Sequence, residues 1–152
     1  MGIYLNPDNN RYERLCNSPI FVDKSLLIEY TNKAINTSND CICVTRPRRF
    51  GKSTDANMLV AYYSKGTNSK DLFNTLNINH CPSFLEHLNK HNVIHLNIQD
   101  FLSTTNSIDE MLSKINRMIL KDLKFEFKDV ITETEIIDAF NEVYAYTKNK
   151  FI

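Results

Sequence analysis

The sequence has no tryptophan, and only 3 of its 152 residues are glycine and 4 are proline. Such low glycine and proline contents exclude a collagen-like repeat and a disordered low-complexity chain. The chain also lacks net charge, because 18 basic residues balance 18 acidic ones. A protein that attracts nucleic acid or a membrane over its whole surface is therefore not expected, and any such role would need a local basic patch.

Long apolar runs are also missing, since no stretch approaches the roughly 20 residues that cross a bilayer. No charged-then-apolar leader opens the chain, so we expect a cytoplasmic protein.

Cys41 and Cys43 alternate along an apolar segment, and we expect them to pack on one face of a strand. A metal site that adds His80 and Cys81 is the alternative, although these spacings differ from those of zinc knuckles. The four histidines are scattered and predict no catalytic set.

What the sequence does contain is an alternation of strand and helix patterns. Residues 41–45 are predicted to be a buried strand, because they are short, β-branched and uncharged. Residues 93–98 are predicted to be a second strand, in which apolar and polar residues alternate. Apolar periodicity predicts helices over residues 24–35, 53–65, 71–76, 83–91, 108–123 and 136–147. The stretch before Pro19 is expected to be turn-rich. This order predicts an α/β sandwich with a mainly parallel sheet flanked by helices.

Two helix caps are also predicted from the spacing of polar residues. Asp23 precedes the helix predicted over 24–35 and would cap it. Thr132 and Glu135 have the spacing of a capping box at the start of the last helix.

The most specific motif, Arg46-Pro-Arg-Arg-Phe-Gly-Lys-Ser-Thr54, lies between the first predicted strand and the helix that follows. A strand, a loop and a helix in this order are the setting of a P-loop. Backbone N–H groups at the start of the helix, together with the helix dipole, attract phosphate. Gly51 would let the backbone approach the ligand, and Lys52 would reach the β- and γ-phosphates. The Ser53 hydroxyl would hold Mg²⁺.

One position departs from the P-loop pattern, because Arg46 stands where the pattern has its first glycine. The alternatives are a basic turn that binds phosphate in another geometry and a solvated basic loop that binds nothing. Four cations within residues 46–52 repel one another by about 1 kcal/mol per close pair, and a bound triphosphate would remove this cost. Direct nucleic-acid binding by these cations around Phe50 is a third alternative, but the balanced charge elsewhere favours a nucleotide.

These residues resemble a known family. Ile20-Phe-Val-Asp-Lys-Ser25, a helix, and then Val44-Thr-Arg-Pro-Arg-Arg-Phe-Gly-Lys-Ser-Thr54 resemble the predicted AAA-type ATPase family with the signature Y-V-D-K … R-P-R-R-F-G-K-[ST]. The opening Met-Gly-Ile-Tyr-Leu-Asn-Pro, Ala61-Tyr-Tyr63, Leu72-Phe73 and the segment 92–96 are similar as well. This family lacks the first glycine as a rule, which accounts for Arg46.

The resemblance implies a nucleotide site with ATP and Mg²⁺ as cofactors, in the N-terminal part of an AAA-like P-loop ATPase domain that covers residues 1–152. The positions that match the nucleotide-binding motif are Arg46, Arg48, Arg49, Phe50, Gly51, Lys52, Ser53 and Thr54, with Ser53 also at the metal. Asp23 and Lys24 are second-rank candidates, because the matching segment of related modules lies beside the base. A helix cap and a solvated lysine are the alternative interpretations of these two residues.

The family continues into an apolar strand that ends in an Asp-Glu pair, often followed by a PD-(D/E)XK nuclease-like domain. We expect residues 151–152 to begin that strand, which leaves the acidic pair, the sensor residues and the nuclease outside this chain. Asp100 is an alternative carboxylate for the metal. The expected function is ATP binding with absent or weak hydrolysis. The alternative is a truncated relative that binds a protein partner, or itself, through an exposed sheet edge without catalysis.

Overall fold

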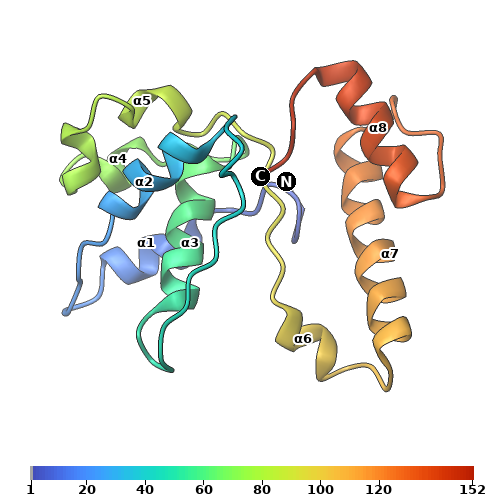
Figure 1. Ribbon diagram of the computed structural model, residues 1–152, viewed down its shortest axis with the longest axis horizontal. Helices are drawn as coiled ribbons and strands as arrows, with labels where there is room; N and C mark the ends of the chain where they lie inside the picture. The colour runs from blue at the N-terminus through green and yellow to red at the C-terminus, as the bar shows by residue number, and fades with distance from the viewer. Residues whose placement is uncertain (1) are drawn as a thin grey trace. The chain divides into compact units, whose positions relative to one another are not determined.

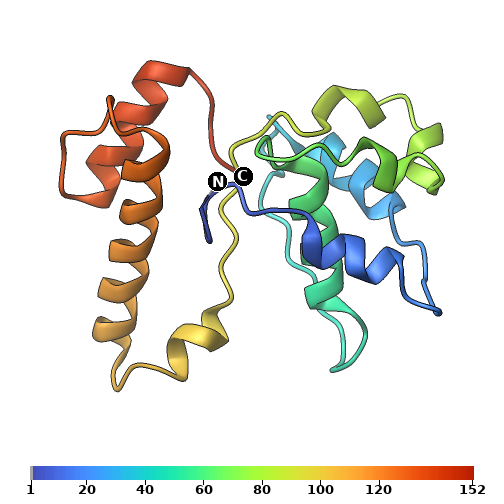
Figure 2. The same ribbon diagram turned by 180° about the vertical axis from the view of Figure 1, so that it is seen from behind.

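The computed structural model describes residues 2–152, and half of the chain is helical. The chain divides into two compact units, which are residues 2–7 with Asn92–Ile152 (unit 1) and Asp8–His91 (unit 2). Figures 1 and 2 show the helices of each unit from opposite sides. Unit 2 contains α1 (Asn10–Cys16), α2 (Leu26–Ala34), α3 (Lys52–Tyr63), α4 (Lys70–Phe73), the 3-10 helix η1 (Asn77–His80) and α5 (Phe84–His87). Unit 1 contains α6 (Ile98–Leu102), α7 (Ile108–Glu126) and α8 (Ile136–Thr147). None of the helices among residues 2–152 is long and apolar enough to cross a membrane.

The predicted sandwich with a mainly parallel sheet is wrong, because residues 2–152 form no sheet. Strand pairing within this range is limited to isolated bridges that join Leu5 to Ile94, Ser64 to His91 and Asn92 to Phe151. A sheet needs a run of backbone hydrogen bonds between neighbouring strands, and single bridges do not provide one. Residues 41–47 have no regular structure, and the segment predicted as the second strand passes into α6 at Ile98. An apolar, β-branched segment is therefore not sufficient to make a strand here. Residues 41–45 pair with no strand among residues 2–152, and the second segment pairs only at single bridges near its start.

The two longest predicted helices are present in unit 1. Helix α7 buries an apolar stripe on one face, formed by Met111, Ile115, Ile119 and Leu123. It lies beside α8, as both ribbon views show, and α8 contributes Ala139 and Val143 to the same core. The Ser107 side chain caps α7 by accepting a hydrogen bond from the Glu110 N–H at 3.1 Å. These elements follow the periodicity of the sequence because their stripes face one local core.

The capping box predicted for α8 is wrong. Glu135 occupies the N-cap position, but its side chain makes no capping hydrogen bond. The Thr132 hydroxyl and N–H donate instead to the Glu142 carboxylate, at 2.6 and 2.9 Å. Glu142 lies within α8, so it ties the preceding turn to the middle of the helix. Glu142 therefore accepts from the Thr132 N–H, the contact that the spacing predicted for Glu135.

Helix α1 lies in the stretch that was predicted to be turn-rich. Its Tyr12 side chain is buried and stacks on Phe73 of α4, with ring centroids 5.2 Å apart and an interplanar angle of 19°. Phe21 meets the Tyr12 ring edge-on at 6.4 Å. Burial of these aromatic rings stabilises a helix whose other residues are mostly polar.

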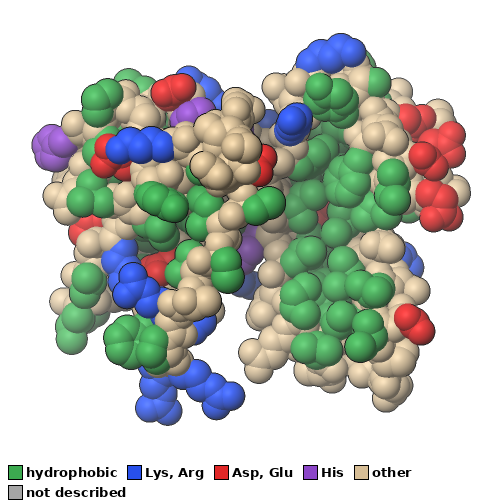
Figure 3. Space-filling view, viewed as in Figure 1, with side chains coloured by type: hydrophobic (Ala, Val, Ile, Leu, Met, Phe, Trp, Pro, Cys, Tyr) green, Lys and Arg blue, Asp and Glu red, His purple; other side chains and the backbone are tan. Residues whose placement is uncertain are grey.

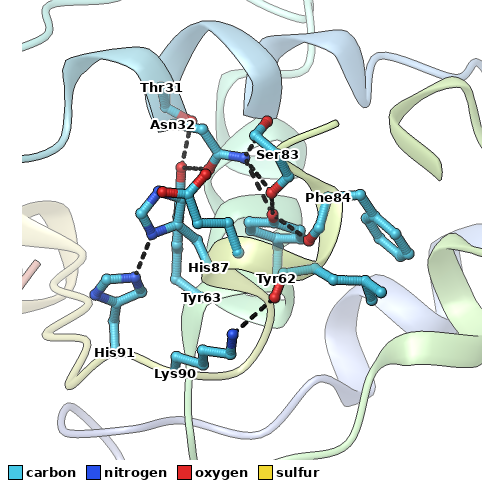
Figure 4. Close-up of polar contacts among 11 residues, drawn as sticks. Thr31, Asn32, Tyr62, Tyr63, Ser83, Phe84, His87, Lys90 and His91 are labelled. Carbon is cyan, nitrogen blue, oxygen red and sulfur yellow. Dashed lines mark hydrogen bonds and ion pairs between the residues drawn. The ribbon is translucent and has the colours of Figure 1, made fainter. Parts of the chain in front are cut away.

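A buried polar network joins α2 to α3 in unit 2 (Figure 4). The Thr31 and Tyr63 hydroxyl oxygens are 2.6 Å apart, and the Tyr63 hydroxyl donates to the Asn32 side-chain oxygen at 2.7 Å. The Asn32 amide donates to the Tyr62 hydroxyl at 3.1 Å, which donates to the Phe84 carbonyl at 2.7 Å. Burial raises the pKa of both tyrosine hydroxyls, so both stay protonated and able to donate. The network holds in place the two helices that the predicted phosphate loop connects.

Two histidines extend this region (Figure 4). His87 Nδ1 lies 3.0 Å from His91 Nε2, and the His91 ring packs edge-on against Tyr63 at 5.6 Å. A hydrogen bond between two imidazole nitrogens needs one of them unprotonated, so the two rings cannot both be charged while the bond exists. Burial, and then the charges of His87 and Lys90, lower the pKa of His91.

We expect unit 2 to lose stability as the pH falls below about 6.5. The unfolded His91 titrates near its ordinary pKa of about 6.5, whereas the folded His91 titrates lower, so the unfolded state binds more protons in this window. The stabilisation is complete above that pH and is lost as the pH falls through the lowered pKa. Thermal denaturation between about pH 7.5 and pH 5 should show a smaller decrease in midpoint for His91→Gln than for the wild type. An equal decrease in both proteins would mean that other groups cause it.

Candidate nucleotide-binding site

The loop before α3 ends at a helix terminus without a side-chain cap. Gly51 is the N-cap residue, with a left-handed φ of 81°, and no side chain caps the helix. The first helical hydrogen bond runs from the Asp55 N–H to the Gly51 carbonyl at 2.8 Å. The N–H groups of Lys52, Ser53 and Thr54 precede that bond and have no acceptor within the helix. Together with the helix dipole, such N–H groups form a site that favours an anion.

Lys52 folds back over this loop. Its ammonium donates to the Arg46 carbonyl at 2.5 Å and to the Pro47 carbonyl at 3.1 Å. The two contacts join the first residues of the motif to the first residue of α3. The ammonium therefore links the start of the loop to the start of α3. Arg46 and Pro47 are exposed, so water can solvate their carbonyls equally well when the ammonium leaves them. A phosphate oxygen would be a stronger acceptor than either carbonyl, because it carries charge.

The same loop carries three further cations. Arg46, Arg48 and Arg49 are exposed, and their guanidinium groups take part in no ion pair within residues 2–152. Figure 3 shows lysine and arginine side chains gathered on the part of unit 2 that carries this loop. The Phe50 side chain is 58% exposed in the same stretch. The positive charge concentrated in one loop suits a polyanionic ligand. The exposed Phe50 ring beside it suits a ligand that also has an aromatic portion.

Of the two second-rank candidates, the structure brings Lys24 to the loop. The Lys24 ammonium donates to the Phe50 carbonyl at 2.9 Å and pairs with the Asp55 carboxylate at 3.2 Å. Asp23 instead accepts from the Ser25 N–H at 2.7 Å and from the Asn77 N–H at 2.8 Å. Burial raises the pKa of Asp23, but these hydrogen bonds outweigh it, and the pKa lies below its ordinary value. Asp23 is not the cap of α2, since Ser25 occupies that position.

The predicted metal ligand Ser53 lies exposed in the first turn of α3, beside the partly exposed Thr54. Within residues 2–152, no group of three or more histidine, cysteine, aspartate or glutamate side chains gathers as a metal site. Mg²⁺ bound with a nucleotide needs few protein ligands, because phosphates and waters complete its shell. A single serine hydroxyl next to the loop fits that requirement. Asp100, the alternative carboxylate, is exposed in the first turn of α6 in unit 1.

The cysteines that precede the loop are not packed as predicted. Cys41 and Cys43 are both exposed free thiols. Ile42 and Val44 between and beside them are 38% and 42% exposed. The expected burial required a strand covered by neighbours, and residues 41–47 do not form one.

A family model described as predicted AAA-ATPase matches residues 10–152. The chain belongs to this family. The match includes the whole loop and confirms the resemblance drawn from residues 20–25 and 44–54. Membership of this predicted AAA-ATPase family indicates nucleotide binding, with ATP and Mg²⁺ as the ligands that the family suggests. A search of curated proteins and a search of solved structures each found no match.

Proposed function

We propose that the chain binds ATP with Mg²⁺ through the loop formed by residues 46–54. The observation that supports this proposal is the start of α3, which no side chain caps, together with the Lys52 ammonium that folds back onto the loop before it. On binding, the phosphates accept hydrogen bonds from the free N–H groups of the first turn. Lys52 exchanges its two carbonyl acceptors for phosphate oxygens, and the Ser53 hydroxyl supplies one Mg²⁺ ligand.

The exposed side chains of the loop have separate roles in this proposal. The guanidinium groups of Arg46, Arg48 and Arg49 neutralise the charge of the triphosphate, and each can bind two of its oxygens through two parallel N–H groups. Phe50 offers an exposed ring on which the base can stack. The choice between adenine and guanine is not set by any of these groups, since charge pairing and stacking are common to both nucleotides.

We propose further that this chain by itself hydrolyses ATP slowly or not at all. Phosphoryl transfer depends on charges placed around the phosphate and on a group that orients the attacking water. Asp55 is the carboxylate in the first turn of α3, and its oxygen is already paired with Lys24. A carboxylate held in this way is a poor candidate for orienting water.

Calorimetric titration of the 152-residue chain with Mg·ATP and with Mg·GTP tests the proposed function. We expect saturable binding of Mg·ATP, with little phosphate released when the same protein is incubated with it. If Mg·ATP does not bind, the proposal is wrong, even if Mg·GTP does. If phosphate is released rapidly and in step with bound nucleotide, the binding proposal stands and the proposal of slow hydrolysis fails.

A further inference from the structure

We propose that Lys24 is a positioning residue, which holds the phosphate loop in its binding conformation and neutralises Asp55 at the start of α3. The proposal rests on the proposed nucleotide site, because it assigns how that site keeps its shape and its positive charge. Lys24 needs no contact with the nucleotide to act in this way. Three sets of contacts within unit 2 support it.

The first set fixes the backbone on both sides of Lys24. The Asp23 carboxylate accepts hydrogen bonds from the N–H groups of Ser25 and Asn77. The Ser25 side chain is fully buried, and its hydroxyl oxygen accepts from the Ile78 N–H at 3.1 Å. Residues 23–25 are thus attached to η1 by their first and last side chains. The side chain of Lys24, between Asp23 and Ser25, is the one that reaches the loop.

The second set joins the two sides of Gly51. The Lys24 ammonium binds the Phe50 carbonyl on one side and the Asp55 carboxylate on the other. A peptide unit is planar and trans, so holding the Phe50 carbonyl toward Lys24 turns the Gly51 N–H in the opposite direction. A Cβ at Gly51 would come within 2.7 Å of the ammonium nitrogen. The absence of a side chain at Gly51 therefore makes room for the ammonium as well as for the left-handed φ.

The third set concerns charge. The Asp55 side chain is 14% exposed and lies in the first turn of the helix whose N–H groups would bind the phosphates. A carboxylate there is favourable for the helix dipole, but it repels an anionic ligand. The ammonium 3.2 Å away compensates that charge. Lys24 thus lets α3 keep an acidic residue in its first turn while the same end binds phosphate.

Four variants separate these two roles. Lys24→Met removes the charge and both contacts but keeps the length of the side chain, and Asp55→Asn removes only the repelling carboxylate. The double variant Lys24→Met/Asp55→Asn restores the net charge of the wild type. Lys33→Met is the matched control, because Lys33 also forms an ion pair, with Glu29 at 2.7 Å, on the exposed face of the neighbouring α2. Thermal midpoints of Lys24→Met and Lys33→Met should lie close to that of the wild type, since both lysines are exposed.

Two measurements are made on each protein: the Mg·ATP affinity by calorimetry, and the rate of tryptic cleavage after Arg48 and Arg49 without nucleotide. We expect Lys24→Met to lower the affinity about tenfold, because the uncompensated Asp55 carboxylate then repels the phosphates, and to speed cleavage of the loop. The double variant should recover affinity to within about threefold of the wild type, because the repelling charge is gone. Its cleavage should stay fast, because the Phe50 carbonyl is still unheld. Asp55→Asn and Lys33→Met should be cleaved at the wild-type rate.

Wild-type cleavage and wild-type affinity in Lys24→Met would overturn the proposal. A double variant as weak as Lys24→Met would overturn the part that assigns charge compensation, and slow cleavage of Lys24→Met would overturn the part that assigns loop shape. If the wild type binds no nucleotide, the proposed function fails, and the cleavage rates still decide whether Lys24 holds the loop.

Discussion

Lys52→Ala is expected to lower Mg·ATP affinity by about 10- to 150-fold, the range that corresponds to one hydrogen bond between charged partners. Lys52 is the first residue of α3, and its ammonium already joins the helix start to the Arg46 and Pro47 carbonyls of the loop. Its present acceptors are the exposed carbonyls of Arg46 and Pro47, so the truncation leaves both to be solvated by water. We therefore expect the free energy of unfolding to change by less than about 0.5 kcal/mol. The loss should appear in binding and not in stability.

Calorimetry on the variant and the wild type, with melting curves for both, checks this expectation. Lys33→Ala is the control, because it removes an exposed lysine of the same unit that lies on α2 and pairs with Glu29. It should bind Mg·ATP like the wild type. If Lys52→Ala also binds like the wild type, the phosphates do not lie at the start of α3, and the loop is the solvated basic segment that the sequence also allowed.

The helices were the more predictable part of the fold. The stripe from Met111 to Leu123 makes α7 recognisable, since its period of three to four residues depends on one helix and one core. Helix α1 lacks such a stripe. Tyr12 was the available signal within the polar stretch, and its burial depends on Phe73, which is distant in the sequence. A contact of that kind cannot be inferred from local periodicity.

The sheet was predicted wrongly because a strand pattern describes one segment and not its partner. Residues 41–45 have the apolar, β-branched composition of a buried strand, yet Ile42 and Val44 are exposed. The second segment pairs only through single bridges. Ile94 pairs with Leu5, and Asn92, directly before the segment, pairs with Phe151. Pairing is decided by which segments meet along several residues, and no pattern within either segment encodes that.

The place of the motif before a helix was predictable, and the contacts of its side chains were not. The motif places the loop directly before a helix, and α3 begins at Lys52 as that reading requires. The resemblance brought Asp23 and Lys24 forward together, and the structure separates them, since Lys24 alone of the two contacts the loop. Asp55 had no distinctive signal, because an acidic residue is common in the first turn of any helix. Its pairing with Lys24 required the three-dimensional arrangement.

Phe73→Ala is expected to lower the free energy of unfolding of unit 2 by about 3–5 kcal/mol. The Phe73 side chain is fully buried between two other rings, with centroids 5.2 Å from Tyr12 and 5.6 Å from Tyr62. Truncation removes both aromatic contacts and leaves a cavity that the surrounding helices can fill only in part. Since Tyr62 also belongs to the polar network between α2 and α3, the loss should spread to the helices that carry the loop.

Urea denaturation followed by circular dichroism measures this effect, with Phe50→Ala as the matched control. Phe50 is 58% exposed, so its truncation should change the free energy of unfolding by less than about 0.5 kcal/mol. Domains of ordinary stability hold about 5–15 kcal/mol, so the loss at Phe73 is a large fraction of the total. Equal midpoints and equal urea slopes for Phe73→Ala and the wild type would contradict the packing described for α1, α3 and α4. Phe73 packs against Tyr62, whose hydroxyl joins α3 to Asn32 of α2, so a stable Phe73→Ala protein would also mean that this network holds the two helices beside the loop without Phe73.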